Sequence, residues 1–303
     1  MTAVVSLRTI NMRDKGFCIS YSPQDGALLS SIEKLGIIEP IVLLQSSPFC
    51  VICGFKRLQA AVKLGFKEVP ARVMQPTPHD ALLMAIHSNI GRGFNMVEKA
   101  QALSKMVEMG FQRDEVYETM ALFSLSPHEK ILANLLSIAS AEEPLKRFIV
   151  EQALSMKTTE YMLWFDAQEK KRIVHALAPM HLTESYVREI LELLHLMKIK
   201  KGKSVAGALK GATDAPDLRA KLKRKVRPML TSLENRLEKI RKAAALPPGI
   251  DIRVDPFFEK EYIDIVARTK SEQETKEIIA KLDEVLKKGH IRSVLELTKG
   301  RVR

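Results

Sequence analysis

The sequence predicts an α+β protein with three parts: a small mixed α/β N-terminal domain, an all-helical middle domain, and a small helix–hairpin–helix domain at the C-terminal end. Three observations lead to this fold class. Short apolar runs alternate with amphipathic segments through residue 95, helical periodicity continues without a clear strand over residues 96–197, and apolar residues alternate with polar ones over residues 250–254. A chain of 303 residues, 46% of them hydrophobic, can form two or three compact domains.

The N-terminal domain is assigned to residues 1–95, where short strands and helices are separated by glycines. Ser22 followed by proline is typical of a helix start, and Gly36 is typical of a helix end. The expected elements are a helix ending at Gly36, strands over residues 37–44, 49–52 and 69–74, and a helix between Gly54 and Gly65. Together they predict a small mixed α/β fold.

The middle domain is assigned to residues 96–197, because apolar residues recur there at helical spacing. Asn95 and Glu98 have the spacing of a capping box at the start of its first helix. Further helices are expected around residues 113–122, 128–139, 143–152, 158–164, 167–177 and 183–197.

Residues 198–217 are predicted to form a basic linker, because glycines interrupt a run rich in lysine. Its lysines include Lys200, Lys201 and Lys203. Two interpretations stay open for this segment: a soluble hinge, or an arm that follows the phosphates of a nucleic acid. The net charge of +12, from 48 Lys and Arg against 36 Asp and Glu, favours a polyanionic partner in general.

Residues 218–303 are predicted to be a dimerisation domain. Apolar residues repeat at 3-4-3-4 spacing from Leu230 to Ala244, two short strands follow, and Ser271 with Glu274 can cap a last helix. A helix–hairpin–helix unit of this size buries little apolar surface by itself. A second copy of the chain is therefore the expected partner of this domain.

The composition argues against a membrane or secreted protein. No apolar run approaches the roughly 20 residues of a membrane-spanning helix, and the N-terminal residues lack the apolar core of a secretion signal. Three cysteines are too few for a disulfide framework, and Cys50 and Cys53 have no second pair to complete a zinc site. The expected location is the cytoplasm.

Residues 51–61, VICGFKRLQAA, place a glycine between an apolar run and a helix whose first turn carries Lys56 and Arg57. A helix start favours negative charge, so two cations in this turn need a reason. Glycine permits the close approach of a phosphate, the first N–H groups of the helix point toward it, and the cations neutralise it. A solvated pair of side chains is the alternative.

A second stretch, residues 88–95 (SNIGRGFN), sets Arg92 between two glycines just before a helix start. Ordering so permissive a loop costs entropy, which a bound ligand would offset. The Asn89 side chain is able to donate to a phosphate or to coordinate Mg²⁺ through its carbonyl oxygen. A plain turn between domains is the alternative.

These stretches resemble the ParB family of DNA-partition proteins, and their order along the chain is the same. Residues 54–61 resemble the family pattern GERRxRAA, residues 31–43 resemble SIxxxGLLQPIVV, and residues 88–100 resemble ENxxRxxLNPIEEA. The resemblance spans most of the chain, because the family continues into a helical domain and often ends in a dimer-forming helix–hairpin–helix. It implies a ParB/sulfiredoxin-like fold for the N-terminal domain.

The ParB resemblance implies a dimeric protein that binds DNA and uses CTP and Mg²⁺ as the switch of a clamp. By this resemblance Gly54, Lys56 and Arg57 hold the triphosphate. Asn89 and Arg92 complete the contacts to the metal ion and the phosphates. The resemblance also implies a role in chromosome or plasmid partition, a nucleoid-associated location, and a ParA-type ATPase as a further partner.

The sequence departs from the family pattern at three places. The glutamate before the asparagine, implicated in hydrolysis, is Ser88 here, and a serine cannot orient or deprotonate water as a carboxylate does. We therefore expect nucleotide binding with slow or absent hydrolysis, at most a weak CTPase. Phe55 replaces another glutamate, and no proline–arginine box is visible in residues 11–21.

A helix-turn-helix is predicted in the middle domain, with Val116–Ala121 in its first helix and Ile131–Leu136 at the end of its second. The intervening residues are more numerous than in the usual short turn. If the second helix enters a major groove, His128, Glu129 and Lys130 are the exposed candidates at its start, and His128 and Lys130 are the expected DNA contacts. A plain helical bundle that contacts only phosphates is the alternative.

Two other functions stay open. A ParB-fold phosphotransferase or nuclease needs a carboxylate base near the phosphate site, where Glu39 and Glu68 are nearest in sequence. A transcription regulator that binds DNA without nucleotide would use the N-terminal domain only as a dimer contact. Sulfiredoxin chemistry is excluded, because the position of its catalytic cysteine is Phe55 here.

Overall fold

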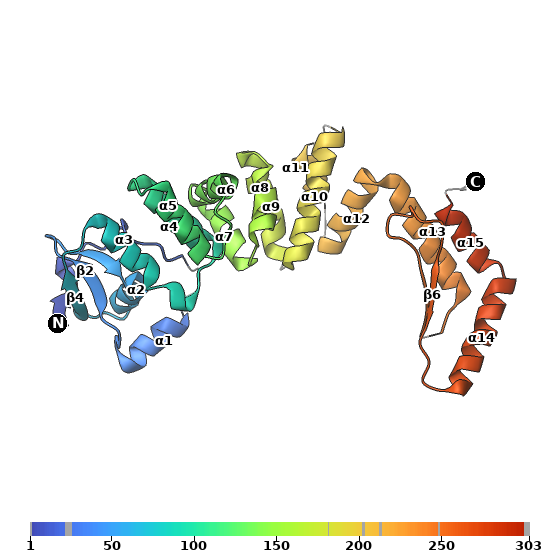
Figure 1. The fold of residues 1–303 in the computed structure, drawn as a ribbon, viewed down its shortest axis with the longest axis horizontal. Helices are drawn as coiled ribbons and strands as arrows, with labels where there is room; N and C mark the ends of the chain where they lie inside the picture. Colours follow the sequence, from blue (N-terminus) through green and yellow to red (C-terminus); the bar gives the residue numbers. More distant parts are fainter. Residues whose placement is uncertain are drawn as a thin grey trace. The chain divides into compact units, whose positions relative to one another are not determined.

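The computed structural model describes residues 2–21, 26–180, 182–201, 204–211, 214–247 and 249–299. The chain divides into two compact units, whose elements are labelled in Figure 1. The first unit comprises residues 1–195 with 205–209, and the second comprises residues 196–204 with 210–303. Ser22, which is expected to begin a helix, lies outside the described residues.

A four-stranded mixed sheet forms the base of the N-terminal domain. Its strands, in their order across the sheet, are β1 (Ala3–Ser6), β4 (Glu68–Met74), β2 (Ile41–Leu44) and β3 (Cys50–Cys53). β4 pairs in parallel with β2, whereas β1 and β3 run antiparallel to their neighbours. The predicted mixed α/β fold is confirmed.

Two strands differ from the expected elements. β1 is not predicted, because a strand of four residues shows too little alternation to stand out. β2 begins at Ile41 and not at residue 37, because Pro40 has no N–H to donate to a neighbouring strand. Ile38, which the prediction places in a buried strand, is 73% exposed.

Helix α2 (Phe55–Lys63) completes the core of the sheet. Its Leu58 and Ala61 pack with buried strand residues such as Ile41 and Val51. This packing fixes the start of α2 directly after the last residue of β3. The other elements here are α1 (Gly26–Leu35), which contacts α2, α3 (Pro78–His87), which contacts β3, and short 3₁₀ helices at Leu7–Thr9 and Ile90–Arg92.

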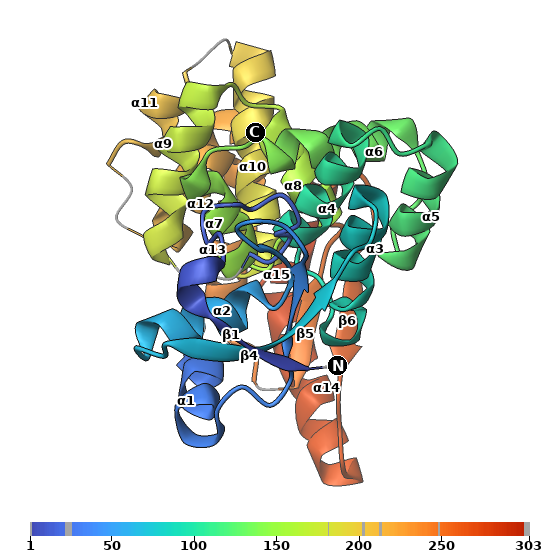
Figure 2. The same ribbon diagram turned by 90° about the vertical axis from the view of Figure 1, so that its left-hand side faces the viewer.

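The rest of the first unit is helical in its described residues. Its helices are α4 (Met96–Glu108), α5 (Arg113–Leu122), α6 (Glu129–Ala139), α7 (Glu143–Glu151), α8 (Met156–Leu163), α9 (Ala167–Leu177), a 3₁₀ turn at Ala178–Met180, the first part of α10 (Glu184–Lys201), and α11 (Val205–Leu209). α5 and α6 pack against α4 (Figures 1 and 2). The predicted capping box of Asn95 and Glu98 begins α4. The helices expected over residues 96–197 are confirmed.

Helices occupy much of the segment that is expected to be a linker. α10 continues to Lys201, and α11 packs against α9 with Val205 and Ala208 buried. α12 (Ala215–Val226) then begins with Asp214 as its N-cap. Val205 and Ala208 hold α11 in place, but in the sequence they stand among glycines and lysines. Two apolar residues in such a segment do not make a recognisable helical pattern, so the sequence gives no indication of this packing.

The second unit has a small core of its own. Its elements after α12 are α13 (Pro228–Ala244), β5 (Ile250–Arg253), β6 (Asp264–Ala267), α14 (Glu272–Lys287) and α15 (His290–Thr298). Leu237, Ile252, Val294 and Leu297 form the buried centre, contributed by α13, β5 and α15. The helix, hairpin and capped last helix are as predicted, but Gly289, with φ of +78°, separates α15 from α14 as an additional helix. None of the described helices combines the length and the apolar character that a membrane crossing requires.

Candidate functional site

The first predicted phosphate-binding stretch lies where β3 passes into α2. Gly54 is the N-cap of α2 with φ of +95°, and no side chain caps the first turn. A Cβ atom at this position would lie 2.4 Å from Cγ2 of Ile41, so packing against β2 also requires glycine here. The first turn contains no acidic residue, and half-buried Lys56 lies within it. Uncapped N–H groups with cations beside them suit a bound anion.

Arg57 contacts the chain that leads into β2. Its Nη1 donates to the carbonyl oxygen of Glu39 at 2.5 Å and lies 3.1 Å from Oε2 of the same residue. The Glu39 side chain is 83% exposed, whereas that of Arg57 is 22% exposed. An ion pair with so exposed a partner is weak, so a phosphate can displace the Glu39 carboxylate from Arg57.

The second predicted stretch is in direct contact with the first. Cys53 is the last residue of β3, and Ser88 follows α3. The Ser88 hydroxyl lies 3.3 Å from the Cys53 Sγ and also donates to the carbonyl oxygen of Ala85. Burial raises the pKa of the Cys53 thiol, while the Ser88 hydrogen bond and the charge of Arg57 partly oppose this rise. The Ser88 hydroxyl therefore joins the two stretches at the Cys53 thiol.

Asn89 and Arg92 are joined within this second stretch. Nε of Arg92 donates to Oδ1 of Asn89 at 2.8 Å, and Nδ2 of Asn89 donates to the carbonyl oxygen of Ala85 at 2.7 Å. The Arg92 guanidinium also lies over the ring of Phe94, 5.6 Å from its centre. The short helix that contains Arg92 is thus ordered by its own side chains.

The remaining side of Arg92 pairs with Glu98, the acidic residue of the capping box. Nη1 and Nη2 of Arg92 donate to the two carboxylate oxygens of Glu98 at 2.9 and 2.8 Å. Glu98 is 1% exposed and also accepts the backbone N–H groups of Tyr21 and Asn95. The sequence indicates the cap of Glu98 but gives no signal for its pairing with Arg92.

Tyr21 links this pair to the helical part of the unit. The Asn95 side chain donates to the Tyr21 carbonyl oxygen at 2.6 Å, and the Tyr21 hydroxyl donates to Glu143 of α7 at 2.8 Å. Burial, followed by the hydrogen bond to Glu143, raises the pKa of the Tyr21 hydroxyl. Tyr21 is therefore a second residue of the site that the sequence does not single out.

The residues present fit a metal ion that is held chiefly by its ligand's phosphates. No group of three or more His, Cys, Asp or Glu residues suited to a metal occurs in the described part of the chain. Oδ1 of Asn89 accepts one hydrogen bond from Arg92, which leaves a second lone pair. Mg²⁺ commonly takes one or two protein oxygens and completes its shell with phosphate oxygens and water.

Those predicted DNA-binding residues that the structure describes lie at the start of α6 and in α10. His128 is the N-cap of α6, and Lys130 in its first turn pairs with Glu160 at 2.6 Å while its own side chain is 77% exposed. Glu129 ties the start of α6 to α5 through Arg113 and Tyr117. The remaining candidates are Lys200 and Lys201, which belong to α10, and Lys203, which lies outside the described residues.

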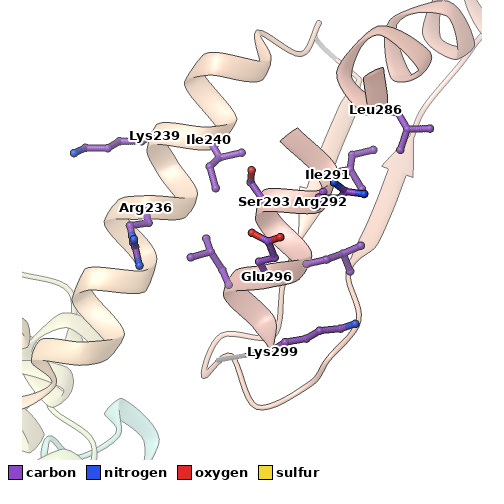
Figure 3. A pocket seen from close by; sticks show the side chains of 11 residues that line it. Arg236, Lys239, Ile240, Leu286, Ile291, Arg292, Ser293, Glu296 and Lys299 are labelled. Carbon is purple, nitrogen blue, oxygen red and sulfur yellow. The ribbon is translucent and has the colours of Figure 1, made fainter. Parts of the chain in front are cut away.

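The second unit contains a groove of about 940 Å³ between α13 and α15, which Figure 3 shows from close by. Ile240 of α13 faces Ser293 and Glu296 of α15 across it. Basic side chains such as Arg236 and Lys299 also line the groove. Its apolar floor is an extension of the small core of this unit.

Comparison with known proteins supports the motif resemblance. The family model of the ParB N-terminal domain matches residues 24–90. A probable chromosome-partitioning protein ParB of Vibrio cholerae is 28% identical over 169 residues, which cover 54% of this chain and 56% of that protein. A nucleoid occlusion protein of Bacillus cytotoxicus is 26% identical over 187 residues, which cover 59% of this chain and 63% of that protein.

Solved structures give a weaker likeness. A truncated ParB of Caulobacter crescentus, complexed to the centromeric parS site, aligns with a TM-score of 0.35 and 15% identity, covering 63% of this chain and 98% of that one. The aligned regions span about 56 to 63% of the length of the curated relatives. Residues 24–90 thus match the ParB N-terminal domain, and this match confirms the resemblance of the sequence motifs to that family.

Proposed function

We propose that this protein is a ParB-like DNA-binding partition protein, which binds DNA as a dimer and uses CTP with Mg²⁺ as the switch of a clamp. The observation that carries the proposal is the contact between the two phosphate-binding stretches through Cys53 and Ser88. This contact joins residues that are 35 positions apart along the chain, which supports a single site built from both stretches. The match of residues 24–90 to the ParB N-terminal domain supports the same conclusion.

Gly54, Lys56 and Arg57 are the proposed contacts of the triphosphate. The uncapped N–H groups at the start of α2 and the two cations supply hydrogen bonds and charge to phosphate oxygens. Asn89 and Arg92 approach from the adjoining stretch, and Asn89 is the proposed protein ligand of Mg²⁺. The bound ion would offset the negative charge of the phosphates.

Ser88 supports slow or absent hydrolysis. Its hydroxyl is hydrogen-bonded to the Ala85 carbonyl oxygen and to the Cys53 sulfur. A neutral hydroxyl held in this way is a far weaker base than a carboxylate, so it is unsuited to accept a proton from water. The proposed role of the nucleotide is therefore binding, with at most weak turnover.

The domain roles follow the proposed boundaries of residues 1–95, 96–197, 198–217 and 218–303. His128 and Lys130 at the start of α6 are proposed to contact DNA, and Lys200, Lys201 and Lys203 are proposed to contact its phosphates. α5 and α6 are joined by six residues, Phe123–His128, a connection longer than the roughly three to four residues of an ordinary helix-turn-helix. A ParA-type ATPase is the further partner that the family resemblance implies.

Self-association is proposed for the second unit. Ile265, Ile279 and Leu286, on β6 and α14, are between 42% and 61% exposed. Exposed apolar residues on so small a core favour pairing with a second copy. The proposed homodimer would bring two DNA-binding regions to one DNA molecule.

The test measures CTP binding and DNA retention on the same sample. Labelled CTP is equilibrated with the full chain by dialysis in Mg²⁺, and DNA retention is followed across a salt series with and without CTP. CTP binding together with CTP-dependent retention supports the proposal. DNA retention that does not depend on CTP favours the alternative of a transcription regulator. Consumption of the nucleotide or the DNA favours the alternative of a phosphotransferase or nuclease. Arg57→Gln should weaken CTP binding. Lys105→Gln is the matched control, because it also removes one positive charge and its ammonium donates to the Lys15 carbonyl oxygen.

A further inference from the structure

The Arg92 guanidinium has little capacity left for a ligand. It carries five N–H donors, and four hydrogen bonds engage it: one to Asn89, one to the Gly93 carbonyl oxygen, and two to Glu98. A guanidinium grips a phosphate most strongly through two parallel N–H groups on one edge. Glu98 takes the edge formed by Nη1 and Nη2, and Asn89 takes Nε of the other edge.

Separating Glu98 from Arg92 costs free energy. Its side chain is 1% exposed, and besides Arg92 it accepts only backbone N–H groups, those of Tyr21 and Asn95, among the hydrogen bonds of the described residues. A buried carboxylate that loses its cation retains its desolvation penalty without the compensating attraction. Any ligand that takes Arg92 away from Glu98 must offset this penalty.

We propose that Glu98 competes with the phosphates of the ligand for Arg92, and that it thereby sets the affinity of the site. This inference rests on the proposed function, because it takes the ligand to be a nucleoside triphosphate. Glu98 acts through Arg92 and is a positioning residue, with no contact of its own to the ligand. Its negative charge holds Arg92 in the arrangement that the structure shows.

Glu98→Gln separates this role from the structural role of the cap. Tyr21 and Asn95 donate to different carboxylate oxygens of Glu98, so a glutamine at this position keeps a carbonyl oxygen for one of these backbone N–H groups, and it no longer carries the charge that holds Arg92. If Glu98 only supports the fold, the variant should bind nucleotide more weakly or equally well. If Glu98 competes for Arg92, the variant should bind it more tightly.

The experiment measures the dissociation constant for labelled CTP by equilibrium dialysis with the full chain. The proteins are the wild type, Glu98→Gln, Arg92→Ala and the double variant, each with and without Mg²⁺. We expect Glu98→Gln to bind about tenfold more tightly, since a charge-assisted hydrogen-bonded pair is released. In the Arg92→Ala background the same substitution should change affinity less than about twofold. Inorganic triphosphate should compete more effectively against Glu98→Gln by a similar factor.

Glu115→Gln is the matched control. Glu115 occupies the same capping-box position in α5, where its carboxylate accepts the Gln112 backbone N–H at 2.8 Å. Its substitution should leave nucleotide affinity within about twofold of the wild type. Weaker or equal binding by Glu98→Gln, or a gain that persists without Arg92, overturns the inference and leaves the proposed function standing. Absence of CTP binding by the wild type and all variants overturns the proposed function itself.

Discussion

Gly54 shows how one residue serves both the core and the site. Its φ of +95° lies in the left-handed region, and the space where a Cβ would stand is filled by Cγ2 of Ile41. The same glycine opens the start of α2 to a ligand. Packing against the sheet therefore explains the glycine before any nucleotide is considered, and the ligand benefits from an approach that the fold already provides.

Gly54→Ala should destabilise the N-terminal domain strongly. We expect a loss of roughly 3 kcal/mol in the free energy of unfolding, from the left-handed backbone together with the clash with Ile41. Gly65→Ala is the control, because Gly65 has φ of +75° but nothing within 4 Å of its would-be Cβ. Its cost should be about 1 to 2 kcal/mol. Equal losses for the two variants in urea unfolding would contradict the role of Ile41.

Ser88 leads to a prediction on catalysis. CTP turnover by the wild type should be slow or absent under conditions where CTP is bound, because the residue before Asn89 is no carboxylate. Ser88→Ala should leave this low rate unchanged. Release of inorganic phosphate, followed beside CTP affinity, provides the measurement. Brisk turnover that Ser88→Ala abolishes would refute the prediction.

The sequence allows some site residues to be predicted and leaves others hidden. Lys56 and Arg57 stand out because cations at a helix start break a local preference, and Gly54 stands out because it separates the apolar run from that helix. The pairing of Arg92 with Glu98 does not stand out, because the turn that brings them together depends on side-chain contacts within residues 89–95. Tyr21 does not stand out for a different reason, because its partners Glu98 and Glu143 are far away along the chain.

Glu184 joins two helices of the middle domain. It lies at the start of α10, where its carboxylate accepts the Thr158 hydroxyl at 2.6 Å and the Ser155 backbone N–H at 3.3 Å. Thr158 is fully buried at the start of α8. The hydrogen bonds from Ser155 and Thr158 lower the pKa of the Glu184 carboxyl below its ordinary value.

Glu184→Gln should therefore destabilise the helical region in a pH-dependent way. Because the folded pKa is lowered, the stabilisation is fully present above the unfolded pKa of about 4.3 and is lost as pH falls through the folded value. We expect the variant to be less stable by about 1 kcal/mol at neutral pH, with a gap that closes below about pH 4. Urea unfolding between pH 3 and 7 measures the difference in the free energy of unfolding between the variant and the wild type. Glu118→Gln, at an exposed position of α5, is the control. A gap that is independent of pH would contradict the assignment.

At the scale of elements, the helices with strong periodicity and caps are predictable, and the short ones are not. Side-chain caps begin α4, α9 and α14, and in the sequence each cap appears as a capping residue followed three residues later by a glutamate. α11 has five residues and is held by packing on α9, and α15 follows α14 after one glycine turn. Tertiary contact stabilises such short helices, so their own sequence carries little signal.

For the whole molecule, the net charge of +12 leads to a prediction on DNA binding. Replacing Lys200, Lys201 and Lys203 together by Gln should weaken binding to any DNA sequence and reduce the slope of log K against log salt by about 2 to 3. Replacing three lysines of α14, Lys276, Lys281 and Lys287, removes the same charge and serves as the control. An equal reduction in both triple variants would show that net charge alone acts.

The proposed homodimer leads to a prediction on molecular mass in solution. Ile279→Glu places a charge on an α14 position that is 61% exposed within one chain, so the fold of the chain should tolerate it. Sedimentation should show a dimer for the wild type and a monomer for this variant. Ile38→Glu, at a position 73% exposed in the N-terminal domain, should remain dimeric. A monomeric wild type, or a dimeric Ile279→Glu, would contradict dimerisation through this surface.

Strand β1 has a consequence for how the N-terminal domain can be isolated. The family match begins at residue 24, whereas β1 and Tyr21 precede it. A fragment cut at the start of the match would uncover one edge of β4 and expose a row of unpaired N–H and C=O groups, which invites aggregation. The same cut would remove the Tyr21 backbone N–H, which donates to the buried carboxylate of Glu98 in α4. The smallest piece able to fold alone is therefore longer than the stretch by which the family is recognised.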